Sequence, residues 1–187
     1  DDKEANIANC RAQVRAAVQE HKADVVALPE CWNSPYGTQS FPIYAEPLSK
    51  PAESPSYQAM SDMAREHGVV LIGGSVPERG EDGRLYNTCL SFGADGGLIG
   101  TYRKMHLFDI DVPGKITFKE SETLSAGNEF CVLDTKHCKI GIAICYDVRF
   151  PEIARHYQEA GCQMIVYPGA FNTTTGPAHW ELLMRAG

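Results

Sequence analysis

Short apolar segments that are typical of buried strands alternate along this chain with segments of helical periodicity. The apolar segments cover residues 24–29, 69–76 and 163–167, and the helical patterns cover residues 4–21, 56–67, 151–160 and the stretch from about residue 178. Two further strand pairs are expected, 85–92 with 98–103 and 130–133 with 139–144. This order predicts an α/β fold with helical layers and a mixed sheet. No internal repeat or linker interrupts it, so we expect residues 1–187 to form a single domain.

Charge and cysteine content exclude several functional classes. The 17 Lys and Arg residues oppose 24 Asp and Glu residues, which gives a net charge of −7. Such a chain is a poor candidate for binding nucleic acid or an anionic membrane, and no apolar run approaches the roughly 18 residues that span a bilayer. The 7 cysteines are irregularly spaced, which argues against a disulfide framework and a zinc site. It favours a reducing compartment.

Cys145 is the first candidate for chemistry. An apolar strand, residues 139–144, leads directly into it, and a helix is expected to begin at Pro151. A side chain at such a strand-to-helix turn lies at the carboxyl edge of a sheet, where α/β proteins bind ligands, and the geometry resembles a nucleophile elbow. The alternative is that Cys145 is simply the last buried residue of the strand.

Glu30 and Lys104 also follow predicted strands. Glu30 directly precedes the long loop at residues 31–55, and Lys104 opens the long loop at residues 104–127. If the strand ends converge, Cys145, Glu30 and Lys104 form a nucleophile, a base and an oxyanion stabiliser. The alternatives are that Glu30 is a solvated loop acid and that Lys104 belongs to a surface basic pair. A rival interpretation is a Cys–His hydrolase that uses His106 or His179.

The sequence resembles the nitrilase superfamily of carbon–nitrogen hydrolases. Four blocks carry the resemblance: Leu28-Pro29-Glu30, the segment YRKMHLFD at 102–109, the segment GIAICYDVRFPE at 141–152, and YPGAFN at 167–172 followed by His179-Trp180. The resemblance implies an α-β-β-α sandwich, Glu30 as general base, Lys104 as oxyanion stabiliser, Cys145 as nucleophile and Glu120 as a second, substrate-positioning carboxylate. It also implies that neither a metal nor an organic cofactor takes part.

Other segments resemble the omega-amidase branch of that superfamily. They are NSPYG at 33–37, LFDIDVPG at 107–114, FKES at 118–121 and TTTGP at 173–177. This branch hydrolyses the side-chain amide of short dicarboxylate monoamides such as 2-oxoglutaramate and 2-oxosuccinamate, and an amidase acting on deaminated glutathione is the alternative within the superfamily. The branch implies a homodimer formed through helices 151–160 and 178–186, located in the cytoplasm and also in the mitochondrion.

Substrate contacts are expected from Tyr36, Tyr146, Arg149, Phe171 and Thr175. Among these, Arg149 suits the distant carboxylate of the substrate because a guanidinium binds a carboxylate through two parallel hydrogen bonds. The alternatives are that Arg149 pairs with Asp147 or Glu152 and that Tyr36 packs within its loop. Members of the superfamily also have a strand before the first helix and strands beyond residue 187. We therefore expect an incomplete domain, and a catalytically inert chain that only pairs with a partner is a further alternative.

Overall fold

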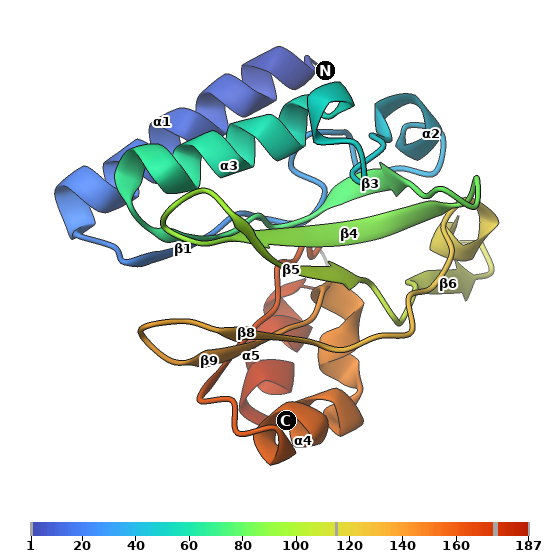
Figure 1. The fold of residues 1–187 in the computed structure, drawn as a ribbon. Coiled ribbons are helices and arrows are strands. Elements are labelled where there is room, and N and C mark those ends of the chain that lie inside the picture. Colours follow the sequence, from blue (N-terminus) through green and yellow to red (C-terminus); the bar gives the residue numbers. More distant parts are fainter. Residues whose placement is uncertain (1, 115, 174–175, 187) are drawn as a thin grey trace.

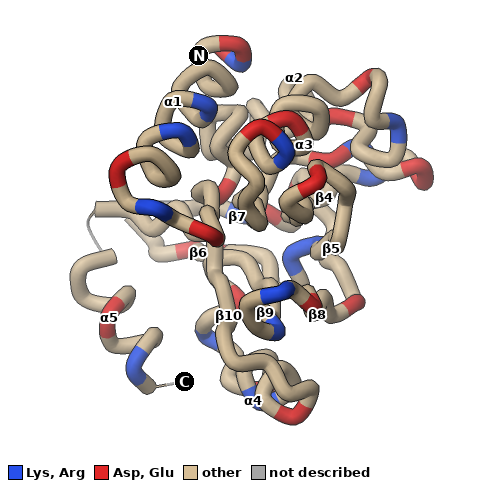
Figure 2. The backbone as a smooth tube through the Cα atoms, turned by 60° about the vertical axis from the view of Figure 1, so that its left-hand side comes forward, with Lys and Arg blue, Asp and Glu red and all other residues tan. Residues whose placement is uncertain are grey.

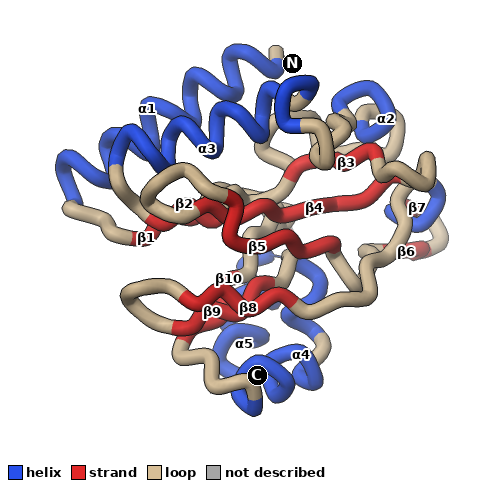
Figure 3. Tube along the Cα trace, in the orientation of Figure 1, coloured by secondary structure: helices blue, strands red, loops and turns tan. Residues whose placement is uncertain are grey.

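Two β-sheets lie face to face between outer helical layers (Figure 1). The computed structural model describes residues 2–114, 116–173 and 176–186. Helices form the outside of the molecule and strands lie between them (Figure 3). This order of helix, sheet, sheet and helix confirms the predicted α/β fold with mixed sheets.

The first sheet is built around its longest strand, β4. Its strands are β1 (Val25–Ala27), β2 (Val70–Ile72), β3 (Val76–Arg79), β4 (Leu85–Phe92) and β5 (Leu98–Arg103). β4 pairs antiparallel with β5 along one edge and with both β2 and β3 along the other, and β1 extends the sheet parallel to β2. Helices α1 (Lys3–His21) and α3 (Pro55–His67) cover the outer face (Figure 1).

The second sheet has β9 at its centre. Its strands are β8 (Cys131–Asp134), β9 (Lys139–Ile142) and β10 (Met164–Val166). β8 and β9 form the predicted antiparallel hairpin, and β10 pairs parallel to β9. Helices α4 (Pro151–Glu159) and α5 (Gly176–Ala186) lie on the outer side (Figure 1). Among the described residues, no helix is long and apolar enough to cross a membrane.

Apolar side chains fill the layers on both sides of the first sheet. Met60 and Met63 of α3 are fully buried against this sheet, and Ile140 and Ile142 of β9 are fully buried between the two sheets. Each such side chain contributes about 1.5–3 kcal/mol by leaving water. Basic and acidic residues are interspersed along α1 (Figure 2), and Cys10 and Val14 are the only buried residues of this helix.

The structure corrects three expectations about local structure. The expected strand at residues 69–76 is interrupted at Gly73-Gly74 and forms β2 and β3 separately. The expected loop at residues 104–127 contains the hairpin β6 (Asp109–Val112) and β7 (Ile116–Lys119) and the short helix η2 (Glu120–Glu122). The expected loop at residues 31–55 contains α2 (Phe41–Tyr44) and η1 (Pro51–Glu53).

The interruption at Gly74 brings the segment that contains Glu30 against the sheet. Gly74 has a φ of +63°, and a Cβ there would lie 2.1 Å from the carbonyl oxygen of Pro29. A residue with a side chain would therefore be both strained and in collision with the backbone. Ser75 then fixes the approaching segment, because its amide donates to Pro29 O at 3.1 Å and its hydroxyl accepts from the Cys31 amide at 2.9 Å.

Candidate active site

Cys145 occupies a sharp turn at the end of the central strand of the second sheet. It begins the short helix η3 (Cys145–Arg149), which leads into α4. Its φ of +47° is unusual for a residue with a side chain and costs roughly 1–2 kcal/mol. The Cys145 amide donates to Pro168 O at 2.8 Å, which ties the turn to the segment after β10. The predicted strand-to-helix elbow is therefore present.

Glu30 is buried and receives hydrogen bonds on both carboxylate oxygens. Its Oε1 accepts from Asn87 Nδ2 at 3.0 Å and from Lys104 Nζ at 2.9 Å, and its Oε2 accepts from the Ala170 amide at 2.9 Å. The neighbouring Cys31 has a φ of +49°, so the backbone turns sharply just after the carboxylate. Glu30 is only 4% exposed, which rules out the alternative that it is a solvated loop acid.

Lys104 lies between two carboxylates. Its Nζ is 2.9 Å from Glu30 Oε1 and 2.9 Å from Glu120 Oε2, and all three side chains are inaccessible to solvent. Burial acts to lower the pKa of Lys104, but the charges of Glu30 and Glu120 outweigh it and hold the pKa well above 10.5. The ammonium therefore stays charged, and Lys104 is not part of a surface basic pair. We call Glu30, Lys104 and Glu120 the buried ion cluster.

The hairpin β6–β7 brings Glu120 into this cluster. Glu120 Oε2 accepts from the Phe108 amide at 2.7 Å, and the Glu120 amide donates to Phe108 O at 3.2 Å. The Tyr36 hydroxyl donates to Glu120 Oε1. Burial, followed by the charges of Glu30 and Glu120, raises the pKa of Tyr36 far above its usual value, so the phenol remains a donor. Tyr36 is therefore more than loop packing.

The buried ion cluster shifts the pKa of the Cys145 thiol. Burial is the largest cause that raises its pKa well above 9.0; the charge of Glu30 and a hydrogen bond with Glu30 raise it further, whereas the charge of Lys104 lowers it. Cys145 is thus a protonated thiol at neutral pH in the resting protein. A base must remove the proton for this sulfur to act as a nucleophile, and Glu30 is placed to do so.

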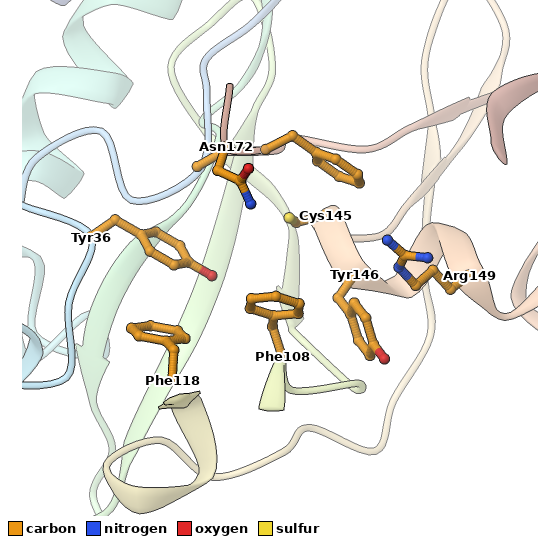
Figure 4. Close-up of a pocket in the computed structure, with 9 residues that line it drawn as sticks. Tyr36, Phe108, Phe118, Cys145, Tyr146, Arg149 and Asn172 are labelled. Carbon is orange, nitrogen blue, oxygen red and sulfur yellow. The ribbon is translucent and has the colours of Figure 1, made fainter. Parts of the chain in front are cut away.

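A cavity of about 210 Å³ opens in front of the Cys145 sulfur. Its lining residues are Tyr36, Phe108, Phe118, Cys145, Tyr146, Arg149, Ala170, Phe171 and Asn172. Figure 4 shows the sulfur at the centre, Tyr36 and Phe118 on one side and the Arg149 guanidinium on the other. The walls are mostly aromatic, with one cation. Among the described residues, no group of three or more His, Cys, Asp or Glu side chains is arranged to hold a metal ion.

Four of the five residues expected to contact the substrate line this cavity. Tyr36, Tyr146, Arg149 and Phe171 line the cavity, whereas Thr175 lies outside the described residues.

Arg149 pairs with neither Asp147 nor Glu152. Its Nη2 is 3.0 Å from His179 Nδ1, and its guanidinium lies over the Tyr146 ring at 5.4 Å. Its Nε is buried, and no hydrogen-bond partner for it occurs among the described residues. A buried N–H group without an acceptor is costly, and Arg149 itself lines the cavity and supplies its one cation.

The histidines do not support a Cys–His pair. His106 Nδ1 is 2.8 Å from Asp147 Oδ1 and the ring stacks on Phe150, with 3.6 Å between the ring centroids. His179 Nδ1 is next to Arg149. The charged groups that shift the pKa of the Cys145 thiol are Glu30 and Lys104.

Sequence reasoning missed several residues of the site. Asn87 binds Glu30, and Asp147 receives hydrogen bonds around the Cys145 turn. Asn87 gave one usable signal, because it is a polar residue within an otherwise buried strand; it is 1% exposed. Phe108, Phe118 and Asn172 lie within segments that carry the family resemblance, but no local pattern assigned them to a cavity wall.

Comparisons with known proteins agree with this geometry. The chain is 57% identical over 184 residues to the omega-amidase NIT2 of Xenopus tropicalis and 55% identical over 184 residues to that of Homo sapiens; each alignment covers 98% of this chain and 64% of the relative. The chain therefore spans less than two thirds of the length of these relatives. The crystal structure of Saccharomyces cerevisiae Nit3, a member of branch 10 of the nitrilase superfamily, superposes with a TM-score of 0.89 at 42% identity, covering 99% of this chain and 65% of Nit3.

The pattern that defines carbon–nitrogen hydrolases extends over residues 1–187. It includes the turn that carries Cys145 and the segments that supply Glu30 and Lys104. The resemblance noted in the sequence is thereby confirmed: the chain belongs to the carbon–nitrogen hydrolase family.

Proposed function

We propose that this protein is an omega-amidase that hydrolyses short dicarboxylate monoamides, such as 2-oxoglutaramate and 2-oxosuccinamate, to the dicarboxylate and ammonia. The observation that carries the proposal is the Cys145 thiol in a small cavity, with the buried ion cluster next to it and a cation in the wall. The similarity to omega-amidases over 98% of the chain supports the same substrate class.

Acylation begins with the transfer of the Cys145 thiol proton to Glu30. The sulfur attacks the amide carbonyl and forms a tetrahedral intermediate with a negative oxygen. The Lys104 ammonium and the Tyr146 amide stabilise this oxygen. The amides on either side of Tyr146 already donate hydrogen bonds within the protein, from Cys145 N to Pro168 O and from Asp147 N to Ile144 O. Glu30 then gives the proton to the leaving nitrogen and the C–N bond breaks. Ammonia departs, and the acyl group remains bound to Cys145 as a thioester.

Deacylation repeats these roles with water. Glu30 takes a proton from a water molecule, whose oxygen attacks the thioester carbonyl. The C–S bond breaks, the acid product forms, and the thiolate recovers the proton from Glu30. Lys104 remains protonated throughout, because Glu120 stays ionised beside it even while Glu30 carries the proton. Glu120 holds Lys104 from the other side at 2.9 Å.

Substrate choice depends on Arg149 in this proposal. The far carboxylate of the substrate accepts from its guanidinium, which lines the cavity, while Tyr36 and Phe171 enclose the carbon chain. The cavity of about 210 Å³ is smaller than the roughly 300–1,000 Å³ of pockets for drug-sized ligands. A four- or five-carbon amide with one distant carboxylate fits a cavity of this size that carries a single cation.

We further propose that the protein acts as a homodimer paired through α4 and α5, in the cytoplasm and mitochondrion. Exposed apolar side chains on α5, Leu182 at 65% and Met184 at 39%, support pairing through this layer. Sedimentation of the purified protein, compared with a variant that carries Leu182→Glu, tests the dimer.

Ammonia release from 2-oxoglutaramate tests the activity. The wild-type protein should release ammonia, and added hydroxylamine should divert the acyl group to a hydroxamate because it attacks the thioester. Cys145→Ala should abolish both products. Cys162→Ala, which changes a thiol outside the cavity lining, should leave them unchanged. A folded protein that releases no ammonia would instead support the inert-chain alternative, and faster turnover of deaminated glutathione would identify the other amidase.

The carboxylate preference is tested separately with succinamate and the uncharged analogue butyramide. A charge-assisted hydrogen bond contributes about 1.5–3 kcal/mol. Arg149→Ala should therefore lower kcat/KM for succinamate by about tenfold to a hundredfold while changing that for butyramide little. An equal loss for both substrates would contradict the assigned role.

A further inference from the structure

Asp147 is a fully buried carboxylate that accepts hydrogen bonds from two separate segments. It lies two residues after Cys145 and has no solvent exposure. Its Oδ2 accepts from the Ile144 amide at 2.9 Å and from the Tyr102 hydroxyl at 2.8 Å. Its Oδ1 accepts from the His106 amide at 2.9 Å and lies 2.8 Å from His106 Nδ1. These four contacts occupy the roughly four lone-pair positions of a carboxylate.

Two of the donors bracket Lys104 and the third precedes Cys145. Tyr102 lies in β5, two residues before Lys104, and His106 lies two residues after Lys104. Both ends of the lysine segment are therefore attached to Asp147. Ile144 is the residue before Cys145, and its carbonyl accepts from the Asp147 amide at 3.0 Å. Asp147 therefore joins segments that are 41 to 45 residues apart in the sequence.

We propose that Asp147 is a positioning residue that fixes the Cys145 turn against the segment carrying Lys104, so that the sulfur and the ammonium keep one separation and orientation. This inference rests on the proposed amidase function for its kinetic consequence. Asp147 does not line the cavity in front of the sulfur, and thus it acts through the two residues that it holds.

The strained backbone of Cys145 gives this role a physical reason. A φ of +47° persists only where the surrounding structure enforces it. Asp147 encloses the strained residue by bonding to both the amide and the carbonyl of Ile144. The carboxylate is also required as such, because the Ile144 amide, the Tyr102 hydroxyl and the His106 amide all donate to it, and the Nδ1-protonated tautomer of His106 adds a fourth donor. Asn has the same shape but would direct its own N–H groups at two of them.

Asp147→Asn should lower kcat without a matching change in KM. Misplacing reacting groups by about 1 Å can cost about a hundredfold in rate, so we expect a loss of about tenfold to a hundredfold in kcat. KM should stay within about threefold because the cavity wall is retained. A rise in KM with unchanged kcat would overturn the proposal, since it would assign Asp147 to substrate binding.

Glu46→Gln is the matched control for lost stability. Glu46 is also a buried carboxylate, 3% exposed, that binds Lys3, Asn33 and Ser56 away from the site. Its substitution should lower the unfolding temperature while leaving kcat within about twofold, because no contact to the site is lost. If Asp147→Asn also retained kcat within twofold at a similar loss of stability, its role would be structural only and the proposal would fail.

Alkylation of Cys145 reports the same geometry without any substrate. The charge of Lys104 lowers the pKa of the Cys145 thiol, so a loosened link between them should slow modification by iodoacetamide and move its pH profile upward. The peptide containing Cys145 is followed by mass spectrometry. A protein that fails to hydrolyse omega-amides but shows slower alkylation in Asp147→Asn would refute the proposed function and retain this inference. Unchanged alkylation would refute the inference.

Tyr102→Phe keeps the proposal testable if Asp147→Asn does not fold. It removes the hydrogen bond that the Tyr102 hydroxyl donates to Asp147 Oδ2 and leaves the carboxylate in place. We expect slower alkylation of Cys145 and a kcat lowered about twofold to tenfold. A kcat and an alkylation rate equal to those of the wild type would contradict the link through Tyr102.

Discussion

Replacing Lys104 by Met should destabilise the protein more than replacing the whole buried ion cluster by neutral side chains. Met has a similar length but no charge. In Lys104→Met, Glu30 and Glu120 would remain as two carboxylates without exposure to solvent and without the ammonium that lies 2.9 Å from each. The triple variant Lys104→Met, Glu30→Gln, Glu120→Gln leaves no charge in the cluster.

The magnitude follows from the burial of all three groups. Removing one partner from a buried ion pair costs about 3–5 kcal/mol, because an uncompensated charge remains, whereas neutral replacement of the whole set is often close to neutral. We therefore expect Lys104→Met to lose about 3–5 kcal/mol of unfolding free energy and the triple variant to lie within about 2 kcal/mol of the wild type. Both variants should lose amidase activity, since both lack the ammonium.

Urea unfolding at pH 7.5, followed by circular dichroism and tryptophan fluorescence, measures the difference. The total stability of a domain of this size is about 5–15 kcal/mol, so the loss in Lys104→Met is large enough to resolve. A loss below 1 kcal/mol in Lys104→Met would refute the assignment of a charged, solvent-excluded cluster. Equal instability of the single and triple variants would show that packing around Lys104, and not its charge, is what stabilises the fold.

Three further predictions concern buried groups near the site. Burial raises the pKa of Cys89 to about 12 from 9.0, so its neutral form stabilises the fold fully below pH 9 and this contribution is lost as the pH rises towards 12. Between pH 8 and 10 the unfolding free energy of the wild type should fall by about 1.4 kcal/mol more than that of Cys89→Ala, and parallel pH curves would contradict this. Gly74→Ala should lower the unfolding free energy measured in urea by about 3 kcal/mol or more, because its Cβ would meet a backbone oxygen at 2.1 Å. Gly83 also has a positive φ but has nothing within 4 Å of the position that a Cβ would take, so the control Gly83→Ala should cost about 1 kcal/mol. Asn87→Asp replaces the Nδ2 group that donates to Glu30 at 3.0 Å by a carboxylate oxygen. Because like charges repel, kcat should fall at least about tenfold. A wild-type kcat would show that this contact is dispensable.

The parts of the fold that could be predicted from the sequence are those set by local apolar patterns. The continuous run before Cys145 identified β9 because both faces of that strand are buried. The same rule failed at residues 69–76, where Gly73-Gly74 interrupts the strand to admit the backbone of Pro29. A close approach between distant segments leaves no mark on the periodicity of either one.

The hairpin β6–β7 was missed for a different reason. β6 is mostly exposed and alternates acidic with apolar residues, so it lacks the apolar run that indicated the other strands. Its turn contains Pro113 and Gly114, which is a usable hairpin signal. The hairpin matters for the site because it places Glu120 beside Lys104, and this contact spans 16 residues. Only the family resemblance, and no local rule, indicated Glu120.

Convergence of the three strand ends depends on how closely the two sheets pack. Glu30 and Lys104 follow strands of the first sheet, whereas Cys145 follows a strand of the second. The sheets meet where Gly100 of β5 faces Leu133 of β8, and a Cβ on Gly100 would lie 2.3 Å from Leu133 Cδ2. A larger residue there would push the sheets apart, and with them the carboxylate and the thiol between which a proton must move. The nucleophile, the base and the ammonium are therefore positioned by contacts between sheets, which is why three residues so far apart in the sequence can act on one amide.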